Sequence, residues 1–129
     1  MYQVVRNHVV EDLQLKDGDK ELILHVDLSV DRILQQYGAA AKALAEAQRD
    51  LQNGVTEDKV EALGRAILGI FELIFGVEQA GKIVEFYDES YTEMLADVAP
   101  FINDVVAPKI NEAQQRIVEQ YKNVKRFKK

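Results

Sequence analysis

The sequence has no cysteine and only two histidines, so functional sites that depend on these side chains are excluded or disfavoured. The absence of cysteine excludes disulfide bonds and thiolate metal sites, and it is consistent with an intracellular setting. Both histidines, His8 and His25, lie near the N-terminus, and no His-x-x-x-His pair occurs. Because a catalytic or metal-binding histidine needs partners that converge in a pocket, we expect exposed strand histidines, no metal site and no cofactor.

The motifs of several enzyme classes are missing as well. No Ser-His-Asp set and no Gly-x-Ser-x-Gly element is evident. The segment from Gly76 to Ile83 nearly matches the phosphate-binding P-loop, but Ile83 stands where that motif has the Ser or Thr that ligates magnesium. Glu78 would also repel a phosphate, and the segment follows a predicted helix instead of a strand. We therefore predict that the chain is not an enzyme and has no catalytic residues.

Long apolar segments are also absent. The first ten residues contain no apolar run typical of a signal peptide, and no segment is long enough to cross a bilayer. The 129 residues, 47% hydrophobic and 29% charged, are typical of one globular domain, residues 1–129. We expect a cytoplasmic protein that does not contact a membrane.

The net charge of −6 is unevenly distributed along the chain. From Lys109 to Lys129 seven cationic residues oppose two glutamates, a balance of +5, so residues 1–108 carry −11. An acidic body disfavours nucleic acid as the main partner. We expect the basic end to complement the dipole of a last helix, and the alternative is that it binds nucleic acid or another anionic surface.

The most apolar stretch, Ala62 to Gly76, predicts a helix at the centre of the core. Only Arg65 and Glu72 carry charge within it. Two apolar stripes with helical spacing run along this segment: Val60, Leu63, Ile67, Ile70 and Ile74, and beside them Leu68, Phe71 and Phe75. Because so much of its surface is apolar, this helix has to be covered from more than one side, by the core or in part by another protein.

Residues 9–27 predict a β-hairpin. Asp17-Gly18 is a strong two-residue turn signal, and with these residues as the loop Leu13 faces Leu22. One face then carries Val9, Leu13, Leu15, Leu22, Leu24 and Val26, and the other carries Val10, Asp12, Gln14, Glu21, Ile23 and His25. Because an isolated hairpin is only marginally stable, this one must lie on helices or join strands of another subunit.

Residues 30–127 predict a helical body. We expect a helix from about Val30 to Gln52 with an alanine-rich middle, and Ser29, Thr56 and Ser90 are the expected N-caps of three helices. Pro100 and Pro108 each either open a helix or kink a longer one. The last helix carries the apolar stripe Val106, Ile110, Ala113, Ile117, Tyr121 and Val124. The predicted fold class is mainly α, a small bundle of about four to five helices with an N-terminal β-hairpin.

Four acidic residues recur at every fourth position: Glu85, Glu89, Glu93 and Asp97. On one helix they would line one face. Carboxylate metal sites in helical bundles usually include histidine ligands from facing helices, and none are available here. We expect a solvated acidic face, with a contact surface for a basic partner as the alternative.

A distinctive run, Glu85-Phe-Tyr-Asp-Glu-Ser-Tyr-Thr-Glu-Met-Leu-Ala-Asp-Val-Ala-Pro-Phe-Ile-Asn-Asp-Val-Val-Ala-Pro-Lys-Ile-Asn-Glu-Ala113, resembles the C-terminal half of small proteins encoded in the tail-gene modules of siphophages and prophages of Gram-positive bacteria. These are tail assembly chaperone-like proteins. The layout is also similar, with an N-terminal strand pair around a glycine turn, Lys16-Asp-Gly-Asp-Lys20, followed by a helical body.

The resemblance implies a non-enzymatic function in the cytoplasm of the bacterial host. Proteins of this family bind the long, largely helical tape-measure protein, keep it soluble and help to recruit tail-tube subunits around it. Apolar helix faces beyond the needs of one core would cover apolar stripes of the partner, and the chain is a possible homo-oligomer. The hypothetical contact residues are Phe71, Phe75, Phe86, Tyr87, Tyr91, Phe101, Ile110, Ile117 and Tyr121.

Two other hypotheses stay open at this point. The chain is a phage structural subunit, at the head–tail junction or in tail completion, if it forms a stable ring without a partner. It is a small nucleic-acid-binding regulator if it binds DNA in a strongly salt-dependent way through residues 122–129.

Overall fold

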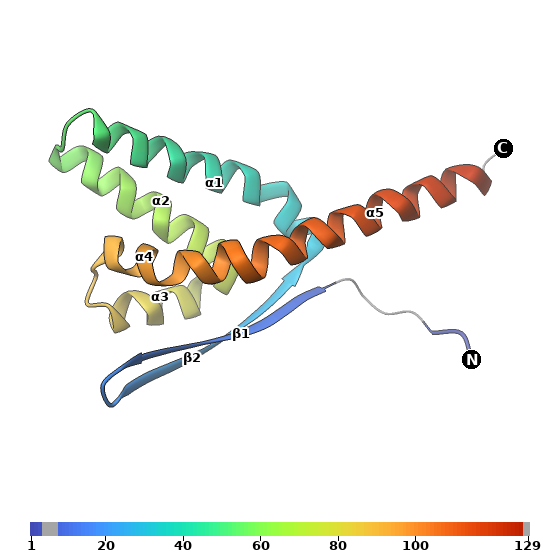
Figure 1. Ribbon diagram of the computed structural model, residues 1–129, viewed down its shortest axis with the longest axis horizontal. Coiled ribbons are helices and arrows are strands. Elements are labelled where there is room, and N and C mark those ends of the chain that lie inside the picture. Colours follow the sequence, from blue (N-terminus) through green and yellow to red (C-terminus); the bar gives the residue numbers. More distant parts are fainter. Residues whose placement is uncertain (4–7, 128–129) are drawn as a thin grey trace.

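The computed structural model describes the backbone of residues 1–3 and 8–127, and the side chains of these residues as far as Lys122. The elements in chain order are β1 (His8–Asp17), β2 (Lys20–Ser29), α1 (Val30–Gln52), α2 (Glu57–Phe75), α3 (Val77–Phe86), α4 (Tyr91–Phe101), a π-helical turn η1 (Ile102–Val106) and α5 (Ala107–Phe127). The predicted fold class is confirmed, because the chain is mainly helical with one antiparallel hairpin at its N-terminal end (Figure 1).

The hairpin is present, but its predicted register is wrong. The loop is Gly18-Asp19 and not Asp17-Gly18, so that Asp17 faces Lys20 and Leu13 faces Leu24. Gly18 has a φ of 61°, and a type II′ turn requires glycine at this first loop position. A glycine in a two-residue loop is compatible with either position, and the sequence alone did not decide between them.

The predicted faces of the hairpin are nevertheless correct. The register shift changes every cross-strand pairing by two residues, and side chains alternate with a period of two, so each residue keeps its face. The buried residues of the apolar face are Val9, Leu15, Leu24, Val26 and Leu28, with Leu13 and Leu22 half-buried. This face lies on the helices, chiefly on α2, and the opposite face is exposed (Figure 1).

Helices α1 and α2 form an antiparallel pair, and their predicted boundaries are confirmed. The hydroxyl of Thr56 accepts a hydrogen bond from the backbone N–H of Lys59 at 3.3 Å, as expected of an N-cap. Ser29 and Ser90 occupy the N-cap positions of α1 and α4, but their side chains make no capping hydrogen bond. Gly76, with a φ of 85°, separates α2 from α3.

The two prolines lie inside one helical run from Tyr91 to Phe127 and do not separate two helices. Pro100 is within α4, and Pro108 is in the first turn of α5. Between them the backbone widens into η1, where the N–H of Ala107 bonds to the carbonyl of Ile102, five residues back. A proline cannot donate to the carbonyl four residues back, and a π-helical turn is one way for a helix to absorb that disruption.

The core is centred on α2, as predicted from its apolar content. Ile67 and Phe71 are fully buried, and α1, α3, α4 and β2 all pack against this helix. The predicted stripe does not reach the start of α2, because Val60 is 48% exposed. Met94 and Val98 of α4 and Ile110 and Ala113 of α5 complete the core on the other side.

Candidate partner-binding surface

An uncharged groove, lined mainly by apolar side chains, lies between α1 and the run α4–η1. It encloses about 260 Å³ and its lining residues carry no charge: Tyr37, Ala41, Leu44, Ala45, Gln48, Ile70, Leu95, Ala99, Ile102 and Asn103. This volume is smaller than that of a usual site for a drug-sized ligand, which is about 300–1,000 Å³. It suits the side chains along one face of a docked helix.

Small side chains keep this groove open. Ala41 and Ala45 lie one turn apart on α1, and Ala99 faces them from α4, so no large side chain fills the space between the two helices. Tyr37 is half-buried at the groove, and burial raises the pKa of its hydroxyl above the ordinary value of 10.0. Leu44 and Leu95 are also half-buried, and each leaves part of its apolar surface open.

The second half of α5 projects past the base of the hairpin, away from the other helices (Figure 1). Burial along its apolar stripe is lost after Ala113: Ile110 is 3% exposed, Ala113 is fully buried, Ile117 is half-buried, and Tyr121 is 67% exposed. Val118, beside the stripe, is 47% exposed. The sequence pattern of an amphipathic helix therefore continues beyond the point where this chain covers it.

Three residues of the predicted contact set belong to the core of this chain. Phe71, Phe75 and Ile110 are 0%, 4% and 3% exposed. The rings of Phe71 and Phe75 meet edge to face, with centroids 5.9 Å apart, and Phe75 stacks on Phe101 at 6.2 Å. In this fold the side chains of Phe71, Phe75 and Ile110 are not available to a partner.

Three other predicted aromatic contacts, Phe86, Tyr87 and Tyr91, are half-buried and lie around the α3–α4 connection. Phe86 and Tyr87 meet edge to face at 5.3 Å, and the hydroxyl of Tyr87 donates a hydrogen bond to Asp97 at 3.0 Å. Burial raises the pKa of Tyr87, and the hydrogen bond and the nearby charge of Asp97 raise it further. Tyr91 packs over Gly64 of α2, where an added Cβ would lie 3.5 Å from its ring.

The nine predicted contact residues thus do not converge on one surface. Tyr121 is an exposed residue near the end of α5 and Ile117 is packed at the edge of the core, whereas Phe86, Tyr87 and Tyr91 lie around the α3–α4 connection. The groove itself was absent from the predicted set. The sequence did contain one indication of it, the alanine-rich middle of α1, which permits close approach by a neighbouring helix.

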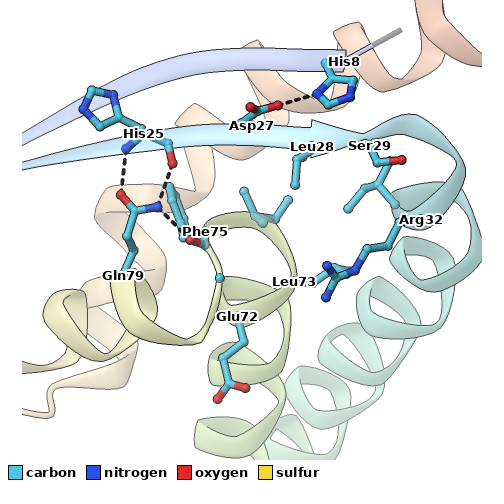
Figure 2. A pocket seen from close by; sticks show the side chains of 13 residues that line it. His8, His25, Asp27, Leu28, Ser29, Arg32, Glu72, Leu73, Phe75 and Gln79 are labelled. Carbon is cyan, nitrogen blue, oxygen red and sulfur yellow. Dashed lines mark hydrogen bonds and ion pairs between the residues drawn. The ribbon is translucent and has the colours of Figure 1, made fainter. Parts of the chain in front are cut away.

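A second, more polar cavity of about 380 Å³ lies where the base of the hairpin meets α1 and α2 (Figure 2). His8 contributes its Nδ1, which lies 2.6 Å from Oδ1 of Asp27, and Arg32 and Glu72 line the opposite side. His25 pairs with another carboxylate, Asp12, at 2.5 Å on the exposed face of the hairpin. Each histidine therefore has its own aspartate, and no set of three His, Cys, Asp or Glu side chains suited to a metal ion occurs within the described residues.

The side chain of Gln79, on α3, forms hydrogen bonds with the backbone at the outer edge of β2 (Figure 2). Its Oε1 accepts from the backbone N–H of His25 at 2.8 Å, and its Nε2 donates to the carbonyl of His25 at 2.7 Å. The same Nε2 donates to the carbonyl of Phe75 at 2.7 Å. The amide thus occupies the place that a neighbouring strand would take beside His25.

The acidic residues spaced by four do not lie on one helix. Glu85 lies near the C-terminus of α3, Glu89 lies in the connection between α3 and α4, and Glu93 and Asp97 are on α4. Asp88 and Glu89 have φ values of 53° and 65°, which reverse the chain between the helices. All four side chains are exposed. Farther along, Lys122 is exposed, and the side chains from Asn123 onward lie outside the described residues.

Comparison with known proteins gives no match: no family model, no curated protein and no solved structure is similar to this chain. Within the part of the chain that the structure describes, no helix has the length and apolar content needed to cross a membrane.

Proposed function

We propose that this chain is a non-enzymatic phage tail assembly chaperone that binds amphipathic helices of a long tape-measure protein. The uncharged groove between α1 and α4–η1 is the observation that carries the proposal. Most of its lining side chains are apolar, and a largely helical partner presents apolar faces repeatedly along its length.

The projecting half of α5 supports the same proposal. Its apolar stripe is covered by the chain itself up to Ala113 and then becomes exposed at Tyr121. An exposed stripe on a free helix would pack against a helix of the partner. The resemblance of residues 85–113 to tail assembly chaperones implies that this partner is the tape-measure protein, with tail-tube subunits as a second partner.

The test is a pull-down of the tagged chain from its host during phage induction, followed by co-expression with the protein recovered. We expect a very long, helix-rich phage protein. Ala41→Phe, which fills the groove, should reduce its recovery at least about tenfold, because the docked helix then loses its apolar contacts. Ala43→Phe is the matched control, because Ala43 is an exposed residue of α1 outside the groove.

Other outcomes would assign other functions. Recovery of capsid or neck components, or of the chain alone as a stable ring, would identify a structural subunit. Recovery of nucleic acid that is released by moderate salt would identify a regulator. Equal recovery of the long protein by the two variants would remove the groove from the interface.

A further inference from the structure

The two outer edges of the hairpin differ in whether their backbone groups have hydrogen-bond partners. The outer edge of β2 is bonded to Gln79 and lies against α2 and α3. The outer edge of β1 runs for ten residues, and within the described part of the chain no strand pairs with it. An open edge of this length presents a row of backbone N–H and C=O groups to which another strand can bond.

The geometry identifies which residues of β1 point these groups outward. In an antiparallel ladder every second pair is hydrogen-bonded, and the pair that flanks a two-residue loop, Asp17 with Lys20, is one of those. The alternation makes Asp12 opposite His25 a pair whose backbone groups point away from each other. The bonds between His25 and Gln79 agree with this assignment. The even-numbered residues from His8 to Lys16 therefore point their backbone groups out of the open edge.

We propose that the open edge of β1 binds β1 of a second copy of this chain, antiparallel about a two-fold axis at Gln14. The two hairpins then form one four-stranded sheet in the order β2–β1–β1–β2. This inference does not rest on the proposed function, because the edge of β1 and the groove share no residue.

Charge complementarity selects the register. With the axis at Gln14, Asp12 of each copy faces Lys16 of the other, so that the pairing forms two attractive contacts. Moving the axis to Asp12 would instead place two aspartates opposite each other. Both registers join outward-pointing residues, and only the first brings opposite charges together.

The apolar face of the hairpin also fits this register. Leu13, which is half-buried in one copy, would lie opposite Leu15 of the second copy. Glu11 would lie opposite Asp17 of the second copy, which is a like-charge contact. It is offset in part because Glu11 forms an ion pair with Lys109 of its own chain and Asp17 lies opposite Lys20 in the hairpin register.

The first test uses proline at two opposed positions. Gln14 and Ile23 face each other across the hairpin, and both point their backbone N–H outward. Proline removes that N–H and leaves the bonds between β1 and β2 in place. We expect sedimentation velocity of the full chain to show a dimer for the wild type and Ile23→Pro, and a monomer for Gln14→Pro.

The second test exchanges charges and does not depend on a proline being tolerated. Lys16→Asp should raise the dimer dissociation constant by about tenfold, because it places like charges together at two symmetric positions. Adding Asp12→Lys should restore the dimer, because it recreates the opposed pair in reversed order. A monomeric wild type at about 100 μM, where even weak specific dimers assemble, overturns the proposal. So does a dimer that neither Gln14→Pro nor Lys16→Asp weakens.

Discussion

The two halves of α5 have the same sequence pattern and opposite surroundings. In the first half Ile110 and Ala113 are buried against the hairpin and the other helices. In the second half Tyr121 occupies the same stripe and is 67% exposed. Between them Ile117 is half-buried, so the change occurs over about two helical turns.

The difference shows what helical periodicity does and does not specify. An apolar stripe makes one face of a helix favour burial, but it does not say which molecule covers that face. Here the first half of α5 is covered by its own chain, and Lys109 adds an ion pair to Glu11 of β1. The second half has no such neighbour among the described residues. Substitutions in the two halves should therefore affect different properties.

The largest effect is expected at Ile110. Ile110→Asp places a carboxylate in the core with no cation to pair it, and burial of an unpaired charge is among the most destabilising single changes. We expect the free energy of unfolding to fall by more than about 4 kcal/mol, or the chain not to fold. Urea denaturation followed by circular dichroism measures this, and a loss below about 1 kcal/mol would mean that the first half of α5 is not part of the core.

Much of the fold follows from local patterns. The apolar content of residues 62–76 predicted the central helix, and alternation along residues 9–27 predicted which side chains of the hairpin are buried. The hairpin register was not predictable, because Gly18 suits the loop at either position. The path of the chain past Pro100 and Pro108 was not predictable either, because it depends on whether tertiary packing favours a π-helical turn.

The candidate partner-binding surface was harder to predict from the sequence than the fold. Phe71 and Phe75 were predicted to contact a partner because they are large and apolar, and the same properties place them in the core. The groove depends on residues with small side chains, such as Ala41 and Ala99, which come together only when α1 and α4 are placed. Residues that create empty space carry a weaker sequence signature than residues that fill it.

A smaller effect is expected at Tyr87, a half-buried member of the predicted contact set that can be compared with the exposed Tyr121. Unlike Tyr121, Tyr87 is held by its own chain through its hydrogen bond to Asp97. Tyr87→Phe removes this bond, and because the residue is only half-buried we expect a loss of no more than about 1 kcal/mol. Urea denaturation at pH 7 measures the difference.

The same substitution should change how stability depends on alkaline pH. The pKa of Tyr87 is raised in the folded chain, so the folded state holds this proton more tightly than the unfolded state, where the ordinary value is 10.0. The stabilisation is complete below pH 10 and is lost as the pH rises above it. Tyr87→Phe should therefore reduce the fall in the free energy of unfolding above pH 10. If this pH dependence is the same in the wild type and the variant, burial and the hydrogen bond to Asp97 do not raise the pKa of Tyr87.

The smallest effect on stability is expected at Tyr121, in the projecting half of α5. Tyr121→Asp should change the free energy of unfolding by less than about 0.5 kcal/mol, because the side chain is mostly exposed. Recovery of the helical partner should nevertheless fall, because a charge then interrupts the stripe that the partner covers. Gln120→Asp, at the exposed neighbouring position, makes the same change in net charge off the stripe and is the matched control. If the two variants recover the partner equally while Ala41→Phe does not, the groove alone forms the interface and the second half of α5 remains uncovered in the complex.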